Sequence, residues 1–139
     1  TSTVLFGTGS IDYNANWDSG YPDGVNEYSW GNYSTARVIA VTIVWSGVPI
    51  GGKGRQIIDY DVMFDTDYLW QIYPTNTTTQ YMDLPNIAIH ETGHGIGLAD
   101  VYDSACSEVT MYGWSTYGET QKRDLAQPDI TGLQKLYGV

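Results

Sequence analysis

The feature that most constrains the fold is a stretch beginning at Asp83, which predicts a helix with two histidines on one face. Asp83 can cap free backbone amides, and the Leu84-Pro85 pair that follows is tolerated in a first helical turn. His90 and His94 are four residues apart, so their rings project from the same face about one turn apart. Two neutral imidazoles at this spacing suit one shared zinc ion.

Two further residues of this stretch predict its chemistry and its end. Glu91 is rotated by about 100° from His90, so it is poorly placed as a ligand but well placed to hold a water beside the metal. Its expected role is that of a general base for the attack of water on a peptide carbonyl. Gly97 adopts positive φ easily, so it should end the helix and turn the chain back toward the metal.

A third metal ligand has to come from outside this helix. The chain contains two histidines, both already used, so either a carboxylate supplies the third ligand or there is none. Asp100 is the best candidate by spacing, whereas Asp103 and Glu108 would require the chain to loop further. The alternative for Asp100 is a solvated or capping carboxylate. The predicted site therefore consists of three zinc ligands and one catalytic base, namely His90, His94, Asp100 and Glu91.

Three other segments predict regular structure. A β-branched run over residues 36–45 predicts a buried strand. The polarity of the side chains alternates along residues 57–64, which predicts a second strand with one face in the core and a wet face exposed to solvent. The residues that we expect on the wet face are Asp59, Asp61 and Met63. Apolar residues at three- and four-residue spacing predict a final helix that starts at Asp129 or just before it.

The remaining segments predict little regular structure. Residues 1–31 are dense in Gly, Asn, Asp and Ser and predict loops and short irregular strands. Residues 47–54 contain four glycines and one proline and predict a flexible connection. The polar segment 74–79 also predicts no regular structure, and such a loop can border a substrate cleft. No internal repeat or linker marks a boundary, so we expect a single domain over residues 1–139.

The charge of the chain excludes two classes of partner. Six basic and 16 acidic residues give a net charge of −10, which repels nucleic acid and anionic membrane surfaces. Between Gln56 and Gln121 there are ten acidic residues and no Lys or Arg. Bound cations would relieve this repulsion, although a solvated acidic face is the commoner interpretation. The candidate calcium ligands are Asp65, Asp67, Asp103 and Glu108.

These motifs together resemble the metzincin clan of zinc peptidases. Residues 90–94 with Gly97 and Asp100 match the long motif of the clan, with Asp in the third ligand position as in snapalysin-like enzymes. Residues 110–113, Thr-Met-Tyr-Gly, resemble the turn with a methionine that underlies the zinc in this clan. Residues 123–138 resemble the C-terminal helix of matrixins.

The resemblance is close over residues 84–138 and looser over residues 23–27 and 59–70. It implies an α+β, metzincin-like zinc peptidase domain: a small twisted mixed sheet, an active-site helix and a C-terminal helix. The cleft should run between an edge strand and the Met111 segment. The family has a long helix between its first two strands, and its pattern is missing here. The N-terminal part is therefore either trimmed away or shortened.

The resemblance also implies an activity, which is that of a secreted, monomeric zinc endopeptidase acting on extracellular polypeptides. The chain begins at Thr1 without a charged and apolar leader, which is typical of a processed or excised mature domain. The alternative function is a catalytically inactive, zinc-stabilised module that binds protein or glycan. An intact Glu91 argues against it, since a structural site needs no base. A zinc amidase for small substrates is disfavoured by the spacing of Gly97, Asp100 and Met111.

Overall fold

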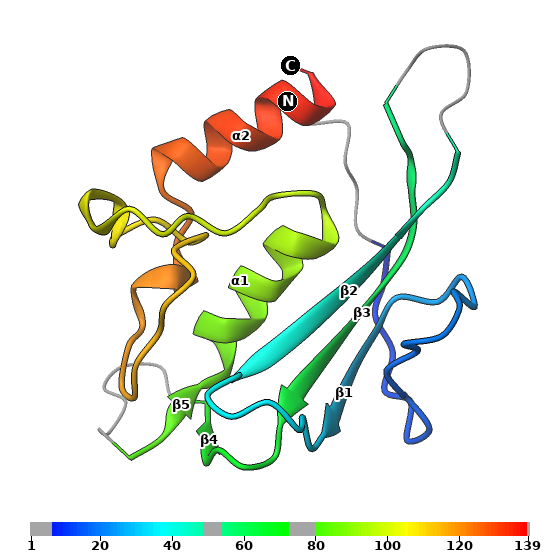
Figure 1. The fold of residues 1–139 in the computed structure, drawn as a ribbon, viewed down its shortest axis with the longest axis horizontal. Coiled ribbons are helices and arrows are strands. Elements are labelled where there is room, and N and C mark those ends of the chain that lie inside the picture. The colour runs from blue at the N-terminus through cyan, green and yellow to red at the C-terminus, as the bar shows by residue number, and fades with distance from the viewer. Residues whose placement is uncertain (1–6, 49–53, 73–79, 139) are drawn as a thin grey trace.

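The computed structural model describes residues 7–48, 54–72 and 80–138. Three strands form its main sheet, which is ordered β1-β3-β2 (Figure 1). They are β1 (Glu27–Gly31), β2 (Ala40–Ser46) and β3 (Ile57–Asp65). Strand β1 is parallel to β3 and β2 is antiparallel to it, so the sheet is mixed, as predicted. Two short parallel strands, β4 (Trp70–Gln71) and β5 (Met82–Asp83), form a second ladder.

Helix α1 (Leu84–Gly95) starts and stops where the sequence predicts. The Asp83 side chain accepts a hydrogen bond from the backbone amide of Asn86 at 2.9 Å, which caps the first turn. Gly97 follows the helix with a φ of 95°, a conformation that costs glycine little. The helix packs against one face of the sheet (Figure 1). Its two histidines are thereby held at a fixed distance from the sheet.

The hydrophobic core lies between α1 and this face of the sheet. It is formed by alternate residues of β3 together with residues from β5 and α1, because side chains along a strand alternate between its two faces. The buried members of this core are Tyr60, Val62, Phe64, Met82 and Ile87.

The opposite face of β3 is buried, so the prediction of a wet face was wrong. Asp59 is 1% exposed, Asp61 is 0% exposed and Met63 is 7% exposed. The segment before β1 lies over this face (Figure 1). Its backbone amides at Asp18 and Gly24 donate to Asp61 and Asp59, at 3.0 and 2.9 Å respectively. Hydrogen bonds from the backbone therefore allow the carboxylates to be buried.

The other predicted elements are present with shifted bounds. Strand β2 begins at Ala40 rather than residue 36, because the chain turns before it and Arg37 has a φ of 71°. The final helix, α2, spans Gln127–Tyr137 and confirms the prediction. Two short 3₁₀ helices, η1 (Ser104–Cys106) and η2 (Gln121–Arg123), lie between α1 and α2.

Some predictions cannot be compared with the structure. The predicted loop at residues 74–79, and residues 49–53 of the glycine-rich connection, lie outside the described residues. Within the parts that are described, no helix precedes β1 or separates it from β2. This agrees with the sequence, which lacks the pattern of the long helix that the family has between its first two strands.

No helix in these parts combines the length and the apolar character needed to cross a membrane.

The close contact between α1 and β3 predicts that Gly95→Ala destabilises the protein. A Cβ atom on Gly95 would lie 2.6 to 2.8 Å from three ring carbons of Tyr60, whose ring is buried. Helix propensity alone would favour alanine by about 1 kcal/mol. We nevertheless expect a net loss of about 1–3 kcal/mol in the free energy of unfolding, because overpacking a core is costly.

Urea unfolding measures this loss, with Gly20→Ala as the matched control, since a Cβ there meets nothing within 4 Å. Equal stability of the two variants would contradict the assigned contact.

Candidate metal centre

The two histidines of α1 are each held by a backbone carbonyl. His90 Nδ1 lies 2.7 Å from the carbonyl oxygen of Thr110, and His94 Nδ1 lies 2.9 Å from that of Leu98. A carbonyl oxygen can only accept, so each Nδ1 carries the hydrogen and each Nε2 of a neutral ring keeps its lone pair. The ring centroids are 4.8 Å apart. Both rings therefore present an unprotonated nitrogen on the same side of the helix.

Asp100 completes a cluster with these two nitrogens. Its Oδ1 lies 3.3 Å from His90 Nε2 and 3.5 Å from His94 Nε2, and the three atoms all lie within 4.8 Å of one another. Oδ1 is buried and receives no hydrogen bond, whereas Oδ2 accepts one from the Tyr102 hydroxyl at 2.9 Å. The structure thus brings the three predicted ligands together and leaves one buried oxygen without a partner.

The spacing of these atoms fits a zinc ion. Zinc binds nitrogen and oxygen ligands at about 2.0–2.1 Å, so two ligand atoms of a tetrahedral site lie about 3.3–3.4 Å apart. The Oδ1 distances to both imidazole nitrogens are close to this value. A cation at this point would also satisfy the buried Oδ1 atom.

The electrostatics of the cluster favour positive charge at its centre. The imidazole of His90, and then that of His94, holds the pKa of the Asp100 carboxyl well below its usual range. Burial lowers the pKa of His94, but the Asp100 carboxylate and the Leu98 carbonyl outweigh burial and raise it overall. Both shifts have the same origin, because the Asp100 carboxylate and a positively charged imidazole each stabilise the charged form of the other.

Glu91 lies beside this cluster, in a cleft between β2 and the segment after Met111. Its side chain is buried, and its Oε2 accepts a hydrogen bond from the Thr42 hydroxyl on β2. One wall of the cleft is residues 37–42 of the edge strand and its approach, and the other wall is residues 112–117. The predicted position of the cleft is confirmed.

Met111 supports the histidine helix from below. It is 3% exposed, and a Cβ atom on Gly93 would lie 2.2 Å from its sulfur, so the thioether packs directly against the helix backbone. The turn that contains it is anchored by Asp129 of α2, whose carboxylate accepts the amides of Thr110 and Met111 at 3.0 and 3.2 Å. Because the same Thr110 holds His90, α2 indirectly orients that ring.

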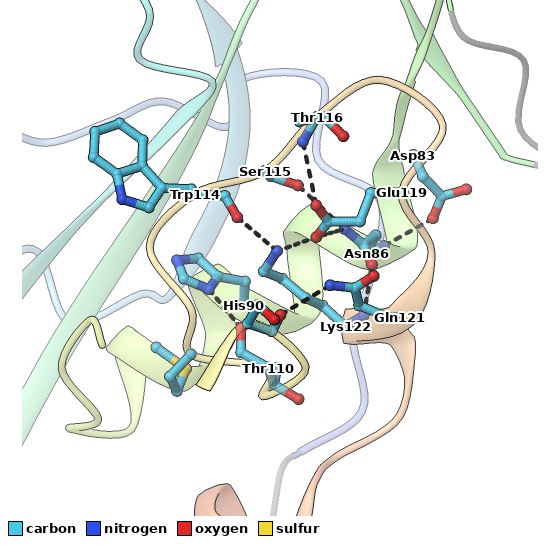
Figure 2. Close-up of polar contacts among 12 residues, drawn as sticks. Asp83, Asn86, His90, Thr110, Trp114, Ser115, Thr116, Glu119, Gln121 and Lys122 are labelled. Atoms are coloured by element: carbon cyan, nitrogen blue, oxygen red, sulfur yellow. Dashed lines mark hydrogen bonds and ion pairs between the residues drawn. The ribbon is translucent and has the colours of Figure 1, made fainter. Parts of the chain in front are cut away.

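A buried polar network holds residues 112–117, the second wall of the cleft, in place. The Lys122 ammonium donates to the Trp114 carbonyl at 2.9 Å and contacts the Glu119 carboxylate, which accepts the Thr116 amide at 3.2 Å (Figure 2). The Lys122 amide donates to the Asn86 side chain of α1 at 2.7 Å. The wall is therefore tied to the start of the histidine helix. Trp114 itself is 63% exposed, so this aromatic residue belongs to the surface rather than to the core.

Several residues of the site have roles that local sequence patterns do not predict. Thr42 is the one hydroxyl of β2 before its terminal Ser46, which is a weak signal for a polar contact. Asp129 was expected only as a helix start, but it also anchors the Met111 turn. Lys122 is 1% exposed, although lysine is rarely buried. The contacts of Thr42 and Asp129 join segments 18 to 49 residues apart, so spacing alone could not find them.

The four predicted calcium ligands do not come together. Within the described residues, no group of three potential metal ligands contains Asp65, Asp67, Asp103 or Glu108. A different cluster of carboxylates, from Asp18, Glu27 and Asp61, lies on the far face of the sheet. Burial raises the pKa of Glu27 and of Asp61. The acidic residues at the ends of β3 and after α1 therefore form no joint site in this part of the chain.

Comparisons with known proteins find a matching family model and several partly similar proteins. The family model of matrixin matches residues 51–138. The chain is 38% identical over 84 residues to neutrophil collagenase of Homo sapiens, which covers 60% of this chain and 16% of that protein. It is 39% identical over 79 residues to metalloendoproteinase 1 of Glycine max, covering 55% and 25%, respectively. It is 34% identical over 101 residues to stromelysin-1 of Mus musculus, covering 66% and 20%. The chain thus spans a quarter or less of each of these relatives.

Proposed function

Because this chain belongs to the matrixin family, we propose that it is a zinc-dependent endopeptidase that hydrolyses internal peptide bonds. One observation carries the proposal. His90 Nε2, His94 Nε2 and Asp100 Oδ1 converge within 4.8 Å of one another, beside a buried carboxylate that lines a cleft. The zinc ligands in this proposal are His90, His94 and Asp100, and the catalytic base is Glu91.

The residues of the site have separate roles in the proposed reaction. Bound zinc supplies a Lewis acid, which polarises the scissile carbonyl and acidifies water. The carbonyls of Thr110 and Leu98 keep the two histidines in the tautomer that can bind it. Glu91 takes one proton from the attacking water and returns it to the nitrogen of the leaving amine. The base is therefore regenerated in each cycle.

The substrate in this proposal is an extended polypeptide. Strand β2 is at the edge of the main sheet and lines the cleft, so its outer edge is available for pairing with a substrate strand. We propose that the domain comprises residues 1–139, acts as a monomer and cleaves extracellular proteins. Calcium binding remains a prediction for this chain.

The test is metal content by mass spectrometry, run beside cleavage of an unfolded protein with and without a zinc chelator. We expect one zinc per chain and cleavage that the chelator abolishes and added zinc restores. Asp100→Ala should retain much less zinc after dialysis than the wild type, whereas Asp103→Ala, a change at an exposed carboxylate, should retain all of it. Bound zinc without any cleavage would instead support the inactive binding module. A folded, metal-replete protein without zinc would overturn the proposal.

A further inference from the structure

We infer that Thr42 is a positioning residue for Glu91, whose carboxylate its hydroxyl holds in the orientation that catalysis requires. The inference rests on the proposed function and adds a residue to the same site. Thr42 lies in the middle of β2, opposite Val62 of β3. Its side chain shares the α1-facing side of the sheet with Ala40 and Val44, because strand side chains alternate.

The contact between Thr42 and Glu91 is direct. Thr42 Oγ1 lies 2.5 Å from Glu91 Oε2 and 3.3 Å from the Glu91 carbonyl oxygen. A hydroxyl has one hydrogen to donate, so the nearer carboxylate oxygen is its acceptor. Thr42 is the single hydrogen-bond donor to this carboxylate among the residues that the structure describes. The contact does not involve Oε1, which we expect to accept the proton of the attacking water.

This contact restricts the rotation of the Glu91 carboxylate, which a catalytic base must hold in one orientation. A glutamate side chain has three rotatable bonds and loses appreciable entropy when it is held in one rotamer. A general base must lie within hydrogen-bond reach of the proton that it abstracts. Helix α1 fixes the backbone of Glu91, but it leaves the carboxylate free to rotate. The hydroxyl on the neighbouring strand supplies the missing constraint.

The composition of β2 supports a specific role for this hydroxyl. The strand is Ala-Val-Thr-Ile-Val-Trp-Ser, and Thr42 is its one polar side chain before the terminal serine. A valine would have nearly the same shape and would fit the same strand position. Packing therefore does not require threonine here, whereas the Glu91 contact does. The same near-identity of shape makes Thr42→Val a clean removal of the hydrogen bond.

The experiment compares Thr42→Val with Thr42→Ser in the zinc-loaded protein. The hydrogen bonds that charged groups make are strong enough that losing this one should lower kcat about 10- to 100-fold. We expect KM and zinc content to stay close to wild type, because the hydroxyl contacts neither metal ligand nor helix cap. Serine keeps the hydroxyl and should restore most of kcat. Thr131→Val, on the exposed face of α2, is the matched control and should behave as wild type.

Two further measurements separate a positioning role from a structural one. In a Glu91→Gln background, Thr42→Val should cause no additional loss of kcat, because residues that act as one unit are not additive. A crystal structure of Thr42→Val gives a readout that does not depend on turnover. It should show the Glu91 carboxylate in more than one rotamer while His90, His94 and Asp100 keep their positions.

The results of these experiments distinguish a failure of this inference from a failure of the proposed function. If the wild type is active and Thr42→Val keeps its kcat, the inference is overturned while the proposed function stands. Loss of zinc from Thr42→Val, or losses that multiply in the double variant, would also overturn it, since the residue would then act on the fold. A wild type without chelator-sensitive cleavage would overturn the proposed function, and this inference with it.

Discussion

Glu91→Gln should lose nearly all turnover and keep its zinc. Glutamine has the same size and can still accept the hydrogen bond from Thr42, but it cannot take a proton from water at neutral pH. General base catalysis contributes about 10²- to 10⁴-fold, so we expect kcat to fall by that factor. Zinc content should not change, because Glu91 is not one of the three converging ligand atoms.

The measurement combines kcat on an unfolded protein substrate with zinc content by mass spectrometry. Glu108→Gln is the control, since it makes the same chemical change at an exposed residue that does not line the cleft. If Glu91→Gln retained wild-type activity, Glu91 would not be the base. If it lost zinc, the carboxylate would have a role in holding the metal.

Asp129→Ala should cause the largest loss of stability among the changes considered. The Asp129 side chain is buried and accepts three backbone amides, from Thr110, Met111 and Ala126, at 3.0, 3.2 and 3.0 Å. Alanine would leave the first two amides buried without an acceptor, and each such group costs about 1–3 kcal/mol. We expect the free energy of unfolding to fall by about 3 kcal/mol or more.

Urea unfolding at neutral pH measures this change, and Asp124→Ala provides the control because the Asp124 side chain is exposed. The metal site should respond too: Thr110 holds both Asp129 and His90, so the variant should bind zinc more weakly. A loss below about 1 kcal/mol would mean that other groups replace the anchor, since that is within the usual range for a single hydrogen bond.

The elements that local patterns predicted well are those whose signals lie within one segment. Helix α1 is specified by the Asp83 cap, the Leu84-Pro85 start and the easy positive φ of Gly97, all within a few turns. Strand β3 was predicted with correct bounds to within one residue, because its alternation is strong. The convergence of His90, His94 and Asp100 follows from the same stretch, since their spacing and one turn bring them together.

The prediction that was wrong depends on a segment far away in the chain. Asp59 and Asp61 have the pattern of a wet strand face, but the amides of the segment before β1 cover them. The deciding hydrogen bonds join residues that the sequence separates by 35 to 43 positions. Calcium binding by Asp65 or Asp103 stays a prediction, because charge alone does not determine which carboxylates meet.

The sequence by itself therefore determined the histidine helix, its ends and the spacing of the candidate ligands. Each of these depends on backbone geometry repeated over a few residues, which residue type and spacing specify directly. The mixed α+β class followed from the resemblance to metzincins. Only the tertiary structure decided that Thr42 meets Glu91 and that Asp129 anchors the Met111 turn. Such contacts form when separate elements pack, and the shape of the whole core determines which side chains then face one another.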